Sequence, residues 1–84
     1  MMTVIAVGEY EVEPGVVFNS GAWRATVTVR AKQPTGPVSE VGYAFAEGYL
    51  SDEAAMKAAQ RYALIASLHP EQRLAIANSE FALQ

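Results

Sequence analysis

The stretch Trp23-Arg24-Ala25-Thr26-Val27-Thr28-Val29-Arg30 alternates apolar and polar residues without a break. Successive side chains of a β-strand point to opposite faces of the sheet, so one face of this strand is entirely apolar. The pattern predicts an antiparallel strand with one face on a hydrophobic core and the other toward water. Trp23 belongs to the apolar face, and we expect it to be buried between the sheet and a helix.

The residues just before this stretch predict its hairpin partner. Tyr10–Phe18 alternates in the same way, and Asn19-Ser20-Gly21 supplies a turn. Opposed residues of a hairpin share a face, so apolar residues must oppose apolar ones. Two registers satisfy this condition: a turn at Asn19-Ser20 pairs Val12 with Val27, and a turn at Ser20-Gly21 pairs Val12 with Val29.

The first strand of the hairpin also carries a proline and three carboxylates. Pro14 cannot donate a backbone hydrogen bond, so the strand is predicted to lie at a sheet edge or to be bulged at Pro14-Gly15. Glu9, Glu11 and Glu13 share its outward face. Neighbouring positions on that face are about 6.6–6.8 Å apart, too far for all three carboxylates to converge on one cation. We therefore interpret them as a solvent-exposed face opposite Arg24 or Arg30, and no metal site is predicted.

A third strand is predicted at Val38–Ala46, after a loop rich in proline and glycine at Ala31–Pro37. Its inward positions are large and apolar: Val41, Tyr43 and Phe45. Its outward positions after Glu40 are unusually small: Gly42, Ala44 and Ala46. The short connections predict an antiparallel meander with the Trp23 strand in the middle.

One clear helix follows. Ser51 is a favourable N-cap, and Asp52 and Glu53 lie where the helix dipole favours negative charge. Pro70 is expected to end the helix. Helical spacing predicts an inward face of mostly small residues, which permits close approach to a sheet: Ala55, Ala58, Ala59, Tyr62, Ile65, Ala66 and His69.

Leu64 and Leu68 do not fit this single inward stripe, because they fall on the face of Lys57 and Arg61. Something is expected to cover them, either the C-terminal tail or a second subunit. The tail is apolar enough to be ordered over Leu74–Leu83, and it could form a short helix opened by Pro70, an extra strand or an irregular arm. Of these, we favour the short helix.

The predicted fold class is therefore α+β: a three-stranded antiparallel meander with one helix packed on one face, plus a short C-terminal segment. The length of 84 residues indicates a single small domain, with its core at 9–69 and the C-terminal segment at 70–84.

Composition excludes several classes of function. The net charge is −3, whereas proteins that bind nucleic acids or anionic membranes without specificity are usually basic. The apolar start, Met1–Val7, lacks the basic region of a signal peptide and is too short to span a membrane. We therefore expect a cytoplasmic protein that binds neither membranes nor, to any appreciable extent, nucleic acids.

No set of residues predicts catalysis. The chain has no cysteine, and its one histidine, His69, precedes Pro70 at the expected helix end. A histidine at that place more often caps the last carbonyl groups than acts as a base. Nucleophilic catalysis needs a nucleophile, a base and an orienting group, so the protein is predicted not to be an enzyme and to need no cofactor.

Two resemblances rest on longer patterns. Gly21-x-Trp23-x-Ala25-x-Val27-x-Val29, followed by Gly48-x-x-Ser51 and by alanines at 55, 59 and 63, resembles small uncharacterised bacterial domains built as a meander and one helix. The hairpin, strand, glycine and alanine-rich helix also resemble the N-terminal half of HicB-type antitoxins. That second resemblance implies a regulatory module that binds a toxin or RNA.

The function predicted from these observations is non-catalytic protein–protein interaction, with another protein or with a second copy as a homodimer. An antitoxin-like module that binds a toxin or RNA is the alternative, and a small-ligand binder comes third. The apolar or small residues without an assigned place in the core form the predicted interaction surface: Leu64, Leu68, Gly42, Ala44, Ala46 and Phe81.

Overall fold

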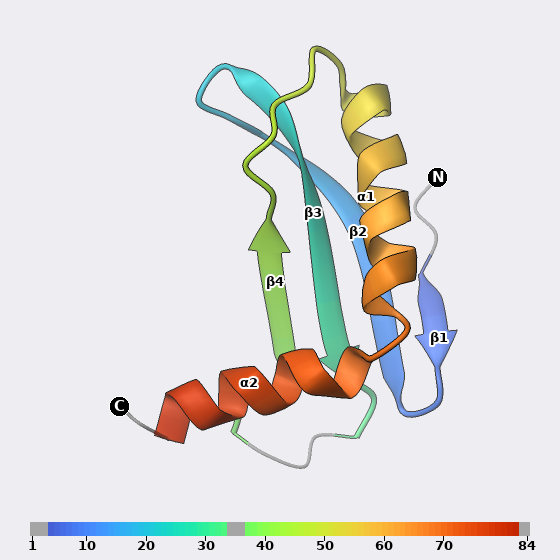
Figure 1. Ribbon diagram of the computed structural model, residues 1–84, viewed down its shortest axis with the longest axis vertical. Coiled ribbons are helices and arrows are strands. Elements are labelled where there is room, and N and C mark those ends of the chain that lie inside the picture. Colours follow the sequence, from blue (N-terminus) through green and yellow to red (C-terminus); the bar gives the residue numbers. More distant parts are fainter. Residues whose placement is uncertain (1–3, 34–36, 83–84) are drawn as a thin grey trace.

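The computed structural model describes residues 4–33 and 37–82, with side chains as far as residue 80. The chain forms a sheet with two helices on one of its faces (Figure 1). The sequence prediction of an α+β fold with an antiparallel sheet is confirmed. The elements in chain order are β1 (Ile5–Val7), β2 (Tyr10–Asn19), β3 (Ala22–Ala31), β4 (Glu40–Ala44), α1 (Asp52–Ala66) and α2 (Pro70–Ala82).

The sheet has the order β1-β2-β3-β4, and all neighbouring strands are antiparallel. The central hairpin uses the second of the two predicted registers, in which Val12 opposes Val29. Ser20 and Gly21 form the turn, with φ angles of 53° and 78°. A two-residue turn with positive φ at both positions matches the twist of the strands that it joins.

The prediction of three strands is wrong because Ile5–Val7 forms a fourth, β1, which pairs with the start of β2. Its three residues are too short a stretch for alternation to be recognised in the sequence. The strand is held by its pairing with β2 and by Ile5, which packs against the core cluster around Val12.

Pro14 is accommodated by its position rather than by a bulge, because the register of β2 and β3 continues through it without interruption. Lys32 donates to the carbonyl of Glu9, so odd-numbered residues of β2 bond to β3 and even-numbered ones face the other side. The pairing with β1 ends at Val12. Pro14 therefore turns its missing N–H toward the side of β2 that β1 leaves unpaired, so the prediction of an edge strand holds only for the part of β2 beyond Val12.

The core lies between the sheet and α1. Ser51 caps this helix, its hydroxyl accepting a hydrogen bond from the Ala54 N–H at 3.1 Å. The helix lies close over β2 and β3 because the residues of its inward face are alanines, and each of these is fully buried: Ala55, Ala58, Ala59 and Ala63. The central strands contribute the larger buried side chains: Val12, Pro14, Val27 and Val29.

Pro70 does not end α1, contrary to the sequence prediction. The helix ends at Ala66, and Pro70 is the first residue of α2, where its missing N–H has no helical partner to lose. The favoured reading of the tail as a helix is confirmed for Pro70–Ala82. Leu74 is only 5% exposed, so this helix is anchored on the sheet.

Three residues predicted to face the core are not part of it, and one of them, His69, is exposed between α1 and α2. Ile65 is 62% exposed because Ala63, rather than Ile65, turns toward the sheet. Trp23 is only half-buried and packs its ring edge-on against Phe18, with ring centroids 5.2 Å apart. It lies beyond the start of α1, whose alanines reach only as far as Ala25.

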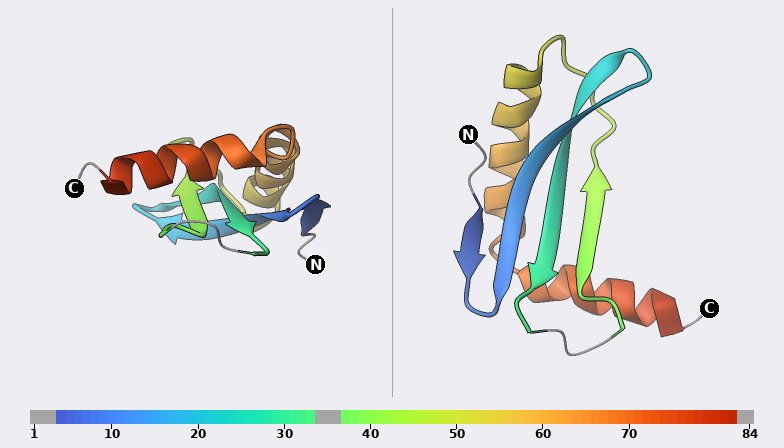
Figure 2. Two further views of the ribbon diagram at one scale, coloured as in Figure 1. Left: turned by 90° about the horizontal axis from the view of Figure 1, so that it is seen from below. Right: turned by 180° about the vertical axis from the view of Figure 1, so that it is seen from behind.

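Both helices lie on the same side of the sheet, and the opposite face is open (Figure 2). α1 runs along the strands, whereas α2 crosses their ends and continues past the β4 edge (Figures 1 and 2). Within the described residues, neither helix has the length and hydropathy needed to cross a membrane.

Candidate functional site

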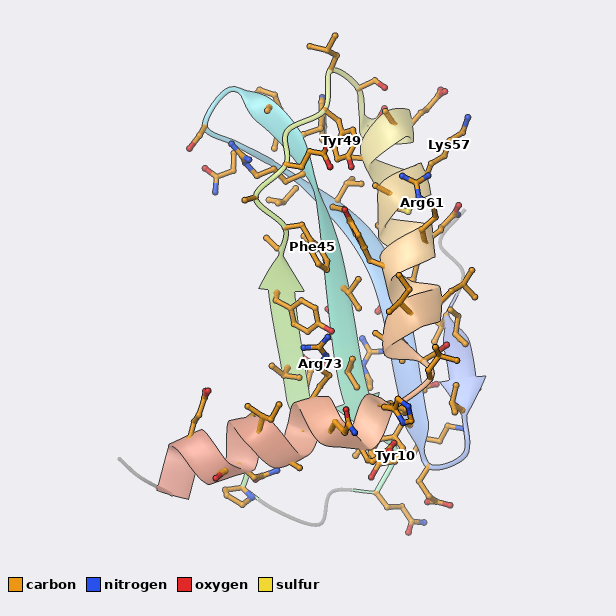
Figure 3. All side chains as sticks on the ribbon, viewed as in Figure 1. Tyr10, Phe45, Tyr49, Lys57, Arg61 and Arg73 are labelled. Atoms are coloured by element: carbon orange, nitrogen blue, oxygen red, sulfur yellow. The ribbon has the colours of Figure 1, made fainter. Side chains whose placement is uncertain are left out.

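The two helices meet at an angle and leave part of β4 uncovered in the corner between them. Figure 3 shows Phe45 in the space between β4 and α1, with Arg73 of α2 below it. We call this region the corner groove and define it by Tyr43 and Phe45 on its floor, Tyr62 on α1, and Arg73 and Ile76 on α2.

The groove has an aromatic floor. The rings of Phe45 and Tyr62 are stacked with centroids 4.0 Å apart, and Tyr43 meets Phe45 edge-on at 5.6 Å. The guanidinium of Arg73 lies over the Tyr43 ring, 5.3 Å from its centroid. Stacked rings with a cation above them form a preformed surface that loses little side-chain entropy on binding.

The groove deepens toward the sheet edge into a shallow cavity of about 170 Å³. Arg73 and Glu80 both line it, and neither forms an ion pair with another described residue. The side chains of β4 and α2 together form its walls: Val41, Tyr43, Arg73, Ile76, Ala77 and Glu80. Opposite charges spaced along one apolar wall suit a partner with its own charges in matching places.

Among the predicted surface residues, Leu64 and Leu68 are 60% and 70% exposed. α2 turns away across the sheet and does not cover them, so the first of the two predicted covers, the tail, is wrong, and a second subunit stays a prediction. With Ile65 they form an apolar surface at the end of α1. A second shallow cavity, of about 210 Å³, lies beside it between Leu64, Gln60, Ile5 and Pro14.

The other predicted surface residues lie elsewhere. Gly42 and Ala44 are exposed on the open face of the sheet, and Ala46 is exposed just after β4. The tail does not cover them, because α2 lies on the opposite face. Position 81 is within α2, but the Phe81 side chain lies outside the described residues, so its predicted role is not tested.

The open face is organised around Arg30. Its Nη2 donates to Glu13 at 2.6 Å and its Nε to Glu40 at 3.0 Å, while Glu11 lies 3.7 Å from Nη1. Hydrogen bonds to Glu13 and Glu40 raise the pKa of the guanidinium above its ordinary value. Arg30 therefore ties together the three strands β2, β3 and β4.

Two of the three carboxylates predicted on the acidic strand face have a basic partner. Glu11 and Glu13 lie opposite Arg30, as the structural interpretation predicted, and their charges serve that contact. Among the described residues, no group of three or more histidine, cysteine, aspartate or glutamate side chains is arranged to hold a metal ion. His69 is exposed, and its Nδ1 lies 3.7 Å from a carboxylate oxygen of Glu71.

The sequence reasoning missed the corner groove. It assigned Tyr43, Phe45 and Tyr62 to the core from their parity and helical spacing, and the three residues do pack there. It could not show that their outer surfaces stay uncovered, because that depends on where α2 crosses the sheet. The only local signal was Arg73, a cation three residues into a helix whose first turn favours negative charge.

Comparisons with protein-family models, curated proteins and solved structures return no match. The resemblances to small bacterial meander domains and to HicB-type antitoxins therefore stay predictions. The geometry of the corner groove is the guide to function.

Proposed function

We propose that the protein is a cytoplasmic, non-catalytic interaction domain that binds a protein surface, of another chain or of a second copy, through the corner groove. The observation that carries the proposal is the exposure of large aliphatic residues around an ordered aromatic floor. Ile65 and Ile76, on the two helices that flank the groove, are 62% and 54% exposed. Single exposed aliphatic residues are common, but a gathered set beside a groove is typical of interaction sites.

The apolar surface of Leu64 and Leu68 lies at the end of α1, and Leu64 faces Ile5 and Pro14 on the side of the helix away from β4. An interface of ordinary size buries about 800 Å² on each partner, more than the groove alone offers. A partner that spans the groove and the end of α1 would bury both sets of residues. Catalysis is not part of the proposal, since the groove is lined by aromatic, aliphatic and a few charged side chains without a nucleophile–base pair.

A regulatory module that binds a toxin or RNA is the second candidate. Arg73 favours it, because a cation beside aromatic rings suits single-stranded nucleic acids. Glu80 in the same cavity and the net charge of −3 oppose it. We therefore expect no appreciable RNA binding at physiological salt, and micromolar, salt-sensitive binding in fluorescence anisotropy would make this candidate the leading one.

The experiment is site-specific photo-crosslinking in cells that express the full chain. A photo-reactive amino acid replaces Ile76 in one variant and Lys32 in the control variant. Lys32 is exposed at the end of β3, away from the groove. We expect a discrete protein adduct from position 76 and none from position 32.

The mass of the adduct identifies the partner as another protein or a second copy of this chain. Equal diffuse labelling from both positions, or no adduct from either, would contradict the proposed function. An RNA adduct from position 76 would support the second candidate instead.

A further inference from the structure

The free edge of β4 is the starting observation. Phe45 donates to the carbonyl of Ala25 and Ala31 donates to that of Ser39, so the odd-numbered residues around β4 bond to β3. Even-numbered residues of this strand therefore turn their backbone N–H and C=O groups outward, away from the sheet.

The chain's own side chains bond to this edge at both ends. Asn78 of α2 accepts from the Val38 N–H at 2.9 Å and donates to the Val38 carbonyl at 3.0 Å, much as a neighbouring strand would. Arg24 donates to the carbonyl of Ala46 at the other end. Between them, no described residue bonds to the outward backbone groups of Glu40, Gly42 and Ala44.

α2 lies over one end of the space in which a further strand would lie. The helix crosses the end of β4 and continues beyond the sheet edge, on the helical side (Figures 1 and 2). Ile76 and Ala77 line the cavity between this part of α2 and β4. A strand added to β4 would pair with its open backbone and pack its side chains beneath the helix, which is a recurrent mode of recognition.

We propose that the added strand is β4 of a second copy, so that two chains pair antiparallel about a two-fold axis at Gly42. This inference rests on the proposed interaction function and names its partner and its surface. The two four-stranded sheets would join into one continuous sheet, and the helix α2 of each copy would cover part of the other copy's corner groove.

The strand register supports a second copy. With Gly42 opposite Gly42, Glu40 opposes Ala44 of the second copy and Val41 opposes Tyr43 of the second copy. Apolar residues meet on the helical face, and the two glutamates are kept apart, since like charges directly opposite each other destabilise a strand pair. The same two-fold axis satisfies both copies, as a symmetric interface requires.

The helices carry a matching charge pattern. The axis places the two copies of α2 antiparallel on the same side of the joined sheet, each at the Glu40 end of its own β4, so a residue near the start of one helix lines up with one near the end of the other. Arg73 would face Glu80 of the second copy, and Glu80 would face Arg73, with Ile76 of both copies between the two pairs. Like several other charged residues, Arg73 and Glu80 form no ion pair within the described part of the chain, so both are free to pair across the axis.

The opposite sheet edge is less suited to such pairing, because it consists of the three residues of β1 and, beyond them, of the part of β2 that contains Pro14. Pro14 of β2 lies on that edge and cannot donate to an added strand. The edge of β4 between Glu40 and Ala44 contains no proline. Self-association through β4 also leaves the β2 edge unpaired, so the assembly closes at two copies and does not grow into a fibre.

The test is sedimentation velocity of the purified full chain from low to high micromolar concentration, with single charge reversals Arg73→Glu and Glu80→Arg. We expect the wild type to dimerise and each single variant to dissociate about tenfold more readily or more, because each homodimer then has two like-charge pairs. An equimolar mixture of the two variants is expected to dimerise again, since an acidic copy then faces a basic copy.

The control is Glu71→Arg, which changes the charge equally on an exposed part of the first turn of α2, outside the cavity that Arg73 and Glu80 line. It should leave dimerisation unchanged. A second variant, Ala44→Pro, removes an outward N–H without breaking a bond to β3 and should also weaken the dimer. Circular dichroism establishes that each variant is folded.

A wild-type chain that stays monomeric overturns this inference, and so does a dimer that the charge reversals leave intact or that the mixture fails to restore. These failures are distinct from failure of the proposed function. If position 76 crosslinks to a different protein while the purified chain is monomeric, the interaction function stands and self-pairing through β4 is wrong.

Discussion

The helical side of the sheet is packed closely under α1 and left open beside α2. Under α1, four fully buried alanines bring the helix down onto the valines of β2 and β3. Beside α2, Leu74 is the only described side chain of the helix, apart from Pro70, that is fully buried. Small residues on a helix thus allow close contact with the sheet and stabilise the fold. Large residues on the rim of a groove remain available for a partner.

The test with the largest expected effect replaces one alanine by leucine in each of the two helices. Ala59→Leu in α1 should lower the free energy of unfolding by about 2–3 kcal/mol, because the extra carbons have no space against the sheet. Ala75→Leu in α2, at an exposed position, should change it by less than about 0.5 kcal/mol. Urea denaturation measures both, and equal losses would contradict the difference between the two halves.

The second test compares the two faces of the sheet. Val29→Ala removes buried methyl groups below α1 and should cost about 2 kcal/mol, since the surrounding residues close the resulting cavity only in part. Val17→Ala is the matched control, because Val17 is 39% exposed on the other face. Its cost should stay below about 0.5 kcal/mol. If Val17→Ala lowered the midpoint of thermal unfolding more than Val29→Ala did, the open face would be covered in solution.

The third test concerns the contact that fixes α2 at the sheet edge. Asn78→Ala removes the two hydrogen bonds to Val38 and one to the Leu74 carbonyl, and should cost about 1–2 kcal/mol. Hydrogen exchange of the Val38 amide should accelerate in this variant. Asn78→Asp keeps an acceptor for that amide and should show an intermediate rate. Unchanged exchange in both variants would show that Asn78 does not hold the helix in place.

The smallest expected effect is a pH dependence at Tyr49, in the connection between β4 and α1. Its hydroxyl donates to Glu47 at 2.9 Å, which raises the pKa of Tyr49 to about 12 from an ordinary value of 10.0. A raised pKa means that the bond stabilises the folded state below pH 10 and that this contribution disappears as the pH rises from 10 to about 12.

Tyrosinate absorbance follows this titration, and the Tyr49→Phe variant identifies the signal. Glu47→Gln removes the charge of the acceptor and should bring the pKa of Tyr49 back toward its ordinary value. A titration near pH 10 in the unmodified protein would show that the hydrogen bond does not persist in solution.

The hairpin, the two registers allowed to it and the capped helix could be predicted because each depends on neighbours in the chain. Alternation through Trp23–Arg30 determines which residues share a face, and Ser20-Gly21 tolerates the positive φ angles of the turn. β1 could not be predicted because a segment of three residues is too short to show the alternation of a strand. Trp23 is predicted to be buried because its position in the alternation shows which face of the strand it belongs to. The alternation does not show how far along that strand a helix extends.

Local pattern alone thus determined the faces of the strands, the N-cap at Ser51 and the exposure of Gly42 and Ala44. Where α2 crosses the sheet depends on contacts between residues far apart in the sequence, such as Asn78 with Val38. That crossing leaves Leu64 and Leu68 exposed, forms the corner groove and passes over one end of the free edge of β4. Only the tertiary structure decided these features, because a helix can bury one apolar face in several ways, and the bonds available at each position select among them.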